Sequence, residues 1–531
     1  MRTRFLVTLA VLSLSNISHA QGRTGASKAD GPWFGLPLPP RMSTEAAVRV
    51  GERAPRPVVL PAGESASPEL LGVALRADVD TIVNFAKQSR ATKEMGSDQM
   101  WGRVSGFPSE SQTVDWAVKR FRQAGIADVK VQSIAQDPRA SFWMPLSWEV
   151  RLLANPAFGP GSADVVLDSA LPLTPSNIPG GTLTAPLVYV GTASPSVAAN
   201  IDVKGRIAVQ LVVPQGHMLF ERGVVDSRSE DLVKRGAVGV FNLVRLPGNE
   251  RSRDFSDCGN PCFNIGGRDG YFLEQVMDRA AGKGVPVQAR ISLKSETRTG
   301  LKANNGVAVI PGRRDDEVIV LNAHVDGWFD GAGDNADGLA VLMALARHFA
   351  KPEHQPERTI ALVASAGHHT PGINGPRSFL MANPELAKKA VMLVNIEHVA
   401  QRNFSPARTT ASDGYREAVA DSGEAPIAVG VTNDSAFLQG LIDDGPSRYG
   451  VNFISERSTF QSGEAGGWTT LNVAKVCVMQ APPLYHTTGE VFDVISTPGL
   501  ERIARFLAHF VKEAGKAPAT QINPLPRRAP F

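Results

Sequence analysis

Cysteine is scarce in this chain of 531 residues, which contains only three. Cys258 and Cys262 lie four residues apart in a stretch with Gly, Asn and Pro that is typical of a loop. In an oxidising compartment this spacing predicts a local disulfide, and the alternative is a pair of free thiols. No second cysteine pair follows, so the sequence does not favour a zinc-finger type of site. Cys477 lies in an apolar run, where we expect a buried strand residue.

Long apolar runs and a strong charge imbalance are also missing. After the first twenty residues no stretch approaches the ~20 apolar residues that a membrane-spanning helix needs. The net charge is +3, from 55 basic and 52 acidic residues. The basic residues are not gathered with aromatic ones, as they are in most nucleic-acid-binding surfaces. We therefore expect neither a permanent membrane span nor a nucleic-acid partner.

The amino terminus has the pattern of an export signal. Arg2 and Arg4 precede an apolar run, and Ser18 and Ala20 supply small residues at the two positions that a signal peptidase reads. The pattern predicts a signal peptide over residues 1–20, with cleavage before Gln21 and a periplasmic or secreted product. The alternative is an uncleaved lipophilic anchor. About 510 residues remain, enough for two or three domains.

The composition and the hydrophobic pattern of the chain divide it into further segments. Residues 21–69 are rich in Pro, Gly and Ala without periodicity, and predict a flexible lead-in. Apolar residues at helical spacing predict helices over 70–90 and 110–124, and alternating apolar residues predict a strand over 128–132. Helices followed by a strand indicate the start of an α/β layer. The predicted segments are the first part of the main domain over 70–172, a block of short strands over 173–297, the rest of the main domain over 298–515, and a tail over 516–531.

The second half of the chain alternates strands with helices. Near-continuous apolar strands are expected at 317–321, 359–364, 391–396 and 473–479, with helices between them. Strands of this kind are buried on both faces. The fold class is therefore predicted as α/β, with a mixed, mostly parallel sheet and helices on both faces.

Four candidate metal ligands follow the ends of these strands: His324, Asp334, Glu397 and His486. Open α/β sheets place their sites at the carboxyl ends of the strands, so one crevice can collect all four. Two imidazoles and two carboxylates suit one or two zinc ions. Asp326, two residues after His324, is placed to orient the imidazole of His324 and is counted among the catalytic residues.

The same segment resembles the zinc aminopeptidase and glutamate carboxypeptidase family, peptidase family M28. The family has an H-x-D motif followed by G-A-x-D-N-x-x-G. The matching residues here are His324, Asp326, Gly331, Ala332, Asp334, Asn335 and Gly338. The similarity continues through VMLVNIEHVA, with Glu397 at the acidic ligand position, and LYHTTGEVFD, with His486 at the last histidine position. It implies a zinc exopeptidase fold in which Asp334 bridges two zinc ions, with His324 and Glu397 on one.

A second resemblance covers the block over 173–297. The segments VKGRIAVQLV, LVKRGAVGVFNL and FNIGGRDGYFLEQV are similar in order and spacing to the protease-associated domain. This small β-rich module is inserted into several exopeptidases. The resemblance implies an inserted domain without chemistry of its own.

One departure from the family pattern concerns the catalytic base. The family has two adjacent glutamates, a general base and a metal ligand, where this chain has His368 and His369. If they replace the pair, His369 joins Asp334 and His486 on a second zinc and His368 becomes the base. Aligning the following Gly-Ile-Asn-Gly without a gap instead pairs His369 with Thr370, leaving no good second-site ligand. Threonine is a poor zinc ligand, so we favour the first alignment.

Two further residues are assigned to substrate binding. Tyr485 is a candidate donor to a developing oxyanion, and the alternative is a packing aromatic. Glu464 is a candidate for substrate contact or for a displaced base, and the alternative is a solvated loop carboxylate.

The leading hypothesis is an exported zinc-dependent hydrolase of peptide or aminoacyl amide bonds, with a metal-activated water. The missing glutamate pair motivates a second hypothesis, a metal-containing binding protein without hydrolytic activity. A third is a related single-zinc enzyme of acyl or amide chemistry, such as cyclisation of an amino-terminal glutamine.

Overall fold

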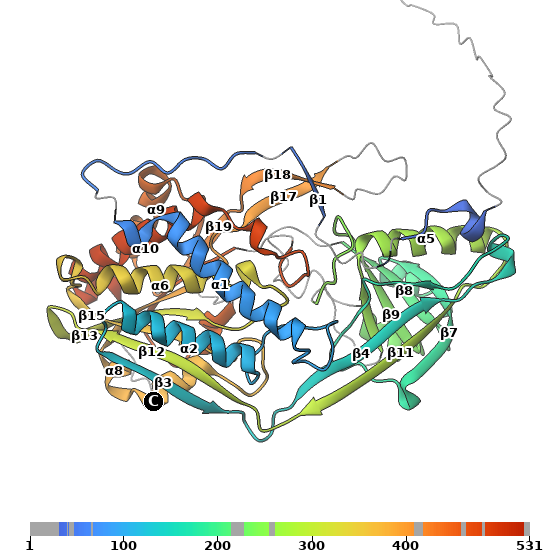
Figure 1. Ribbon diagram of the computed structural model, residues 1–531, viewed down its shortest axis with the longest axis horizontal. Helices are drawn as coiled ribbons and strands as arrows, with labels where there is room; N and C mark the ends of the chain where they lie inside the picture. The colour runs from blue at the N-terminus through green and yellow to red at the C-terminus, as the bar shows by residue number, and fades with distance from the viewer. Residues whose placement is uncertain are drawn as a thin grey trace, which may run out of the picture.

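The apolar strands of the second half form the centre of an eight-stranded sheet (Figure 1). The computed structural model describes residues 31–39, 41, 47–51, 53–64, 67–213, 228–253, 261–407, 418–457, 463–480 and 484–524. The order of the strands is β20 (Phe453–Arg457), β19 (Ile427–Val431), β21 (Ala474–Met479), β16 (Ala390–Glu397), β13 (Arg314–His324), β15 (Arg358–Ser365), β12 (Lys302–Ile310) and β3 (Asp128–Ala135).

The four central strands β21, β16, β13 and β15 are parallel, and antiparallel pairings lie toward the edges. Alternate residues of these strands pack on opposite faces. Ile319 and Leu321 join one core, and Val318 and Val320 join another. The sheet is therefore buried on both sides, which confirms the predicted α/β class.

Helices cover the two faces unequally (Figure 1). The larger core contains residues of the long helices, and the smaller core contains residues of two short ones. The long helices are α1 (Gly72–Ala91), α2 (Pro108–Gln123), α6 (Asp337–Phe349), α9 (Ala436–Tyr449) and α10 (Thr497–Lys516), and the short ones are α7 (Gly375–Ala382) and α8 (Pro384–Lys389).

A second eight-stranded sheet forms the smaller unit with α5 (Gly267–Gly282) (Figure 1). Its order is β5 (Val165–Val166), β4 (Phe142–Leu152), β11 (Gln288–Arg298), β7 (Thr182–Gly191), β8 (Ile207–Val212), β9 (Gly239–Val244), β10 (Cys262–Ile265) and β6 (Leu171–Pro172).

This unit begins earlier in the chain than the predicted boundary at residue 173. The reason is that β4 pairs with β11 along its whole length, from Phe142 to Leu152. Local sequence gives no sign of this pairing, since the partner lies more than 130 residues away. The chain crosses between the two units through β3 to β4 and returns through β11 to β12 (Figure 1).

Parts of the lead-in, which was predicted to be flexible, are packed against the rest of the protein, whereas most described residues of 50–63 are exposed. Trp33 is fully buried, and its indole Nε1 donates to Ala163 O at 2.9 Å. Strand β1 (Val48–Val50) pairs in parallel with β18 (Ala418–Glu424). These contacts are long-range, so the Pro-rich and Gly-rich composition of the segment did not reveal them.

Some predictions fall on residues outside the described ranges. The predicted signal peptide over 1–20 and Cys258 are among them. Cys262 is disulfide-bonded and buried in β10, whereas Cys477 is buried in β21, where its Sγ accepts from Asn395 Nδ2 at 3.8 Å. Across the described residues, every helix is too short or too polar to cross a membrane.

Candidate metal centre

The predicted ligands meet at the carboxyl edge of the parallel strands. His324 and Glu397 are the last residues of β13 and β16. His368 and His369 follow the end of β15, and Asp334 lies in the turn that leads into α6. The parallel directions of these strands bring their ends together, as the sequence predicted.

The carboxylate of Asp334 is the centre of the site. Its Oδ2 lies 2.9 Å from His369 Nε2 and 3.0 Å from His486 Nε2. Its Oδ1 lies 3.0 Å from His398 Nε2 and 3.4 Å from His324 Nε2. Each carboxylate oxygen therefore faces two imidazoles, and Asp334 itself is fully buried.

Backbone carbonyls orient two of these imidazoles. His324 Nδ1 lies 2.9 Å from Asp326 O, and His398 Nδ1 lies 3.2 Å from Gln480 O. A carbonyl oxygen only accepts, so each Nδ1 carries the hydrogen and Nε2 is the nitrogen directed at Asp334. This is the usual outer hydrogen bond of a metal-binding histidine.

Asp326 positions two parts of the site. Its carboxylate Oδ1 lies 3.4 Å from His324 Nδ1, farther than its own backbone oxygen. Its Oδ2 accepts from the hydroxyl of Ser105 and from the backbone N of His369, both at 3.0 Å. Asp326 therefore orients His324 mainly through its backbone carbonyl. Its side chain holds the loop that carries His369.

The buried polar atoms of the site that make no hydrogen bond to a described residue include His324 Nε2 and Glu397 Oε2. The other oxygen of Glu397 accepts from Asn395 Nδ2 at 2.9 Å and from the backbone N of Glu464 at 2.6 Å. Unsatisfied buried polar atoms are rare in folded proteins and call for a partner such as an ion. Ligand atoms of His324, Glu397 and His398 lie within 4.8 Å of one another, as do those of His324, Asp334 and His369. The donor set fits a cation.

His368 contacts a buried carboxylate other than Asp334. Its Nδ1 lies 3.2 Å from Glu464 Oε2, and Ser365 Oγ donates to Glu464 Oε1 at 2.9 Å. Thr370 is turned in another direction, with its hydroxyl donating to Ser105 O at 2.9 Å. The structure thus brings His369, and not Thr370, to Asp334.

Comparisons with known proteins agree with this arrangement. The sequence profile of Peptidase family M28 matches residues 305–511. Residues 305–511 are thus similar to peptidase family M28. The matched segment contains all five predicted metal ligands.

One curated relative and two solved structures are also similar to this chain, and the likeness to the solved structures extends beyond residues 305–511. A probable glutamate carboxypeptidase from Arabidopsis thaliana is 28% identical over 200 residues, which is 36% of this chain and 27% of that protein. A peptidase M28 precursor from Shewanella amazonensis has a similar structure, with a TM-score of 0.61 at 18% identity, covering 86% of this chain and all of that one. A zinc aminopeptidase from Bacillus subtilis gives 0.56 at 16% identity, covering 86% and 99%. At these identities the two structures show a shared fold.

Burial and neighbouring charges shift the pKa values of the side chains at the metal centre. Burial by itself raises the pKa of Asp334, but the facing His369 and His486 outweigh it and hold that pKa well below its ordinary value. Burial lowers the pKa of His369 to about 4. For His368 burial also acts downward, but the hydrogen bond to Glu464 prevails and raises its pKa to about 10. Burial raises the pKa of Glu464.

Tyr485 packs between two histidines. Its ring stacks on that of His486, with centroids 3.6 Å apart, and lies 4.9 Å from the ring of His398. The residue is buried. The ring of Tyr485 therefore packs against the metal centre, and its role as an oxyanion donor stays a prediction.

Sequence reasoning missed two residues of the site. His398 directly follows Glu397, and a histidine beside a predicted ligand was the available clue. Arg103 in β2 (Gly102–Arg103) is fully buried, and its guanidinium donates to the carbonyl oxygens of the turn that carries Asp334. No local pattern predicts this contact across more than 220 residues. The acceptors are Val325 O, Asp330 O, Gly331 O and Asp334 O, at 2.8 to 3.2 Å.

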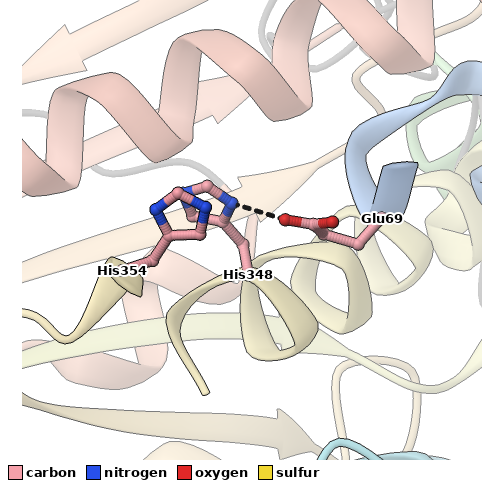
Figure 2. A group of neighbouring side chains, drawn as sticks. All are labelled: Glu69, His348 and His354. Carbon is pink, nitrogen blue, oxygen red and sulfur yellow. Dashed lines mark hydrogen bonds and ion pairs between the residues drawn. The ribbon is translucent and has the colours of Figure 1, made fainter. Parts of the chain in front are cut away.

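A separate histidine group lies at the end of α6, and Figure 2 shows it. His348 Nδ1 lies 2.9 Å from Glu69 Oε1, and the rings of His348 and His354 stack with centroids 3.9 Å apart. The ammonium of Lys351 pairs with the second oxygen of Glu69. Because Lys351 already balances the carboxylate charge, the group is an ion-pair cluster that joins η3 (Pro68–Leu70) to α6.

Proposed function

We propose that this chain is an exported zinc-dependent hydrolase of peptide or aminoacyl amide bonds. The observation that carries the proposal is the convergence of imidazole nitrogens on the buried carboxylate of Asp334, beside an unsatisfied oxygen of Glu397. A buried cluster of this kind is costly without a cation, because each polar atom has lost its water. Similarity of the segment 305–511 to peptidase family M28 and the fold of a zinc aminopeptidase support the metal and the reaction class.

The ligand assignment follows from the two oxygens of Asp334. His324 faces Oδ1, and Glu397 is grouped with His324, whereas His369 and His486 face Oδ2. Asp334 would then contribute one oxygen to each of two metal positions. Zinc bound there supplies a Lewis acid that polarises a carbonyl group and lowers the pKa of a bound water.

The proton transfers fall to His368 and Glu464 in this proposal. His368 stands where the family has its glutamate base, with its ring 4.4 Å from that of His324 and 4.6 Å from that of His369. Glu464 holds His368 Nδ1, which fixes the ring and leaves Nε2 for the reacting water or leaving group. The neutral ring accepts the proton of the attacking water and returns it to the leaving amine. Because Glu464 raises the pKa of His368 to about 10, the neutral ring is a minor form at neutral pH, and turnover is expected to rise toward alkaline pH.

Export and a substrate-facing accessory unit complete the proposal. The amino-terminal pattern over residues 1–20 supports transport out of the cytoplasm. The smaller unit contacts the metal centre directly, since the backbone N of Arg253 donates to His486 O at 3.0 Å. Arg253 also covers the ring of Trp328, with Cζ 3.7 Å from the centroid. We assign this unit to the inserted protease-associated type and place it at the rim of the substrate path.

The test combines metal analysis of the purified protein with digestion of an untargeted peptide library. We expect one or two zinc ions per chain and release of terminal residues by the wild-type protein. Asp334→Asn should lose both. Wild-type protein that holds a full complement of zinc and cleaves no aminoacyl or acyl-amide substrate would instead support a metal-containing binding protein.

A further inference from the structure

His398 lies at the metal centre, although the family pattern quoted above assigns no role to its position. It is buried, with 1% of its surface exposed, and directly follows Glu397 at the end of β16. Its Nε2 lies 3.0 Å from Asp334 Oδ1. The same oxygen faces His324 Nε2 at 3.4 Å.

The arrangement around the two oxygens of Asp334 is nearly symmetrical. His369 and His486 lie 2.9 and 3.0 Å from Oδ2, and His398 and His324 lie 3.0 and 3.4 Å from Oδ1. Two ligands of one tetrahedral zinc, each about 2.0–2.1 Å from the metal, lie roughly 3.3 Å from each other. All four contacts are within a few tenths of an ångström of that separation.

The orientation of the ring also matches a ligand. Gln480 O faces His398 Nδ1 at 3.2 Å, which fixes the hydrogen on Nδ1 and directs Nε2 into the site. Glu397 Oε2 makes no hydrogen bond to the described residues, and ligand atoms of His324, Glu397 and His398 lie within 4.8 Å of one another.

We infer that His398 is an additional metal ligand, and that it makes the two metal positions unequal. This inference rests on the proposed metal centre. The position at Oδ1 then has four protein ligands, His324, Glu397, His398 and Asp334. The position at Oδ2 has three, His369, His486 and Asp334.

The difference in ligand number gives the two metal positions different roles. Zinc sites with four protein ligands are typically structural, whereas catalytic sites keep a coordination position open. The Oδ2 position is therefore the one that accepts a water and substrate, and the Oδ1 position anchors the bridging carboxylate. His369, next to the base His368, belongs to the open position.

The competing explanation is that His398 only donates a hydrogen bond that orients Asp334. Two substitutions separate these roles. His398→Gln removes the imidazole but keeps a polar side chain of similar reach. His398→Glu offers a carboxylate that binds a cation but cannot donate to Asp334 and repels it when no cation is present.

The experiment measures cobalt binding to the metal-free full-length protein, by metal analysis and by the visible absorption of the bound ion. We expect two cobalt ions per wild-type chain. His398→Gln should weaken one of them by about 100-fold or more and remove its part of the spectrum. His398→Glu should restore the stoichiometry, with a spectrum shifted by the change from nitrogen to oxygen.

Control measurements keep the outcomes distinct. The second ion of each variant reports a folded site, and His348→Gln, in the cluster of Figure 2, controls for the loss of a buried histidine. Unchanged affinity and spectrum in His398→Gln would overturn the inference, as would a failure of His398→Glu to recover the ion while its other ion binds normally. A wild-type protein that binds no cobalt or zinc would overturn the proposed function itself.

Discussion

Glu464 Oε2 and His368 Nδ1 lie 3.2 Å apart, although 96 residues separate them in the sequence. The carboxylate is buried and is held from its other side by the hydroxyl of Ser365. A carboxylate behind an imidazole fixes the ring and stabilises its protonated form. In the proposed mechanism this pair, joined by a long-range contact, takes the part of the general base.

The first prediction concerns this pair. His368→Gln should lower turnover by roughly 10²–10⁴-fold, the usual contribution of a general base, and leave the metal content unchanged. Glu464→Gln should lower turnover less, by about 10–100-fold, because the imidazole remains. Steady-state hydrolysis and metal analysis of the same preparations check both.

Thr370→Val is the matched control, because the hydroxyl of Thr370 is bonded to Ser105 O and does not face Asp334. We expect its turnover to stay within a few-fold of the wild type. A loss as large as that of His368→Gln would favour the alternative alignment, in which His369 and Thr370 stand at the positions of the glutamate pair.

The second prediction concerns the bridging carboxylate. Asp334→Asn should abolish hydrolysis and reduce the bound metal to a trace, since both metal positions lose a charged ligand. Zinc that binds only the folded state raises the midpoint of thermal unfolding. We therefore expect added zinc to stabilise the metal-free wild type and to leave the melting curve of Asp334→Asn unchanged. An equal shift in both proteins would place the metal elsewhere.

The third prediction concerns Arg103. Arg103→Lys keeps the charge but cannot supply the fork of donors that reaches Val325, Asp330, Gly331 and Asp334. We expect the free energy of unfolding to fall by about 2–4 kcal/mol, from buried carbonyls left without donors. Metal affinity should fall about 10–100-fold because the turn that carries Asp334 loosens. Chemical denaturation and competition with a chelator measure the two effects, and a variant with native metal affinity would argue against a positioning role.

The fourth prediction concerns the pH dependence of stability at the cluster of Glu69 and His348 (Figure 2). Burial lowers the pKa of His348 to about 4 from an ordinary 6.5. For Glu69 burial acts upward, but Lys351 and His348 prevail and lower its pKa to about 2 from 4.5. The unfolded chain binds more protons than the folded chain in both ranges, so stability rises with pH.

The contribution of His348 is complete above pH 6.5 and is lost as the pH falls toward 4. That of Glu69 is complete above pH 4.5 and is lost as the pH falls toward 2. His348→Gln should therefore flatten the dependence of the unfolding free energy on pH between 6.5 and 4, and Glu69→Gln should flatten it below 4.5 and abolish the ion pair with Lys351. Denaturant unfolding at a series of pH values measures both slopes, and an unaltered slope in His348→Gln would contradict the assignment.

Much of the fold could be predicted from local pattern. The strands that form the parallel centre of the sheet are apolar at consecutive positions because both of their faces are covered. Such apolar runs can be recognised in the sequence itself. The extent of the smaller unit was not predictable in the same way. Its β4 is defined by pairing with β11, and a strand edge has no local signature of a distant partner. The packed Trp33 shows the same effect in the lead-in.

The sequence by itself determined which residues are brought to one edge, because His324 and Glu397 end parallel strands and such ends must meet. It also predicted that His368 and His369 stand in place of the glutamate pair of the family it resembles. Only the tertiary structure decided how these side chains are used. Contacts of His398 with Asp334, of Glu464 with His368 and of Arg103 with the turn of Asp334 depend on the orientation of side chains from distant elements. The periodicity of a chain predicts its elements, but packing alone selects the rotamers that face one another.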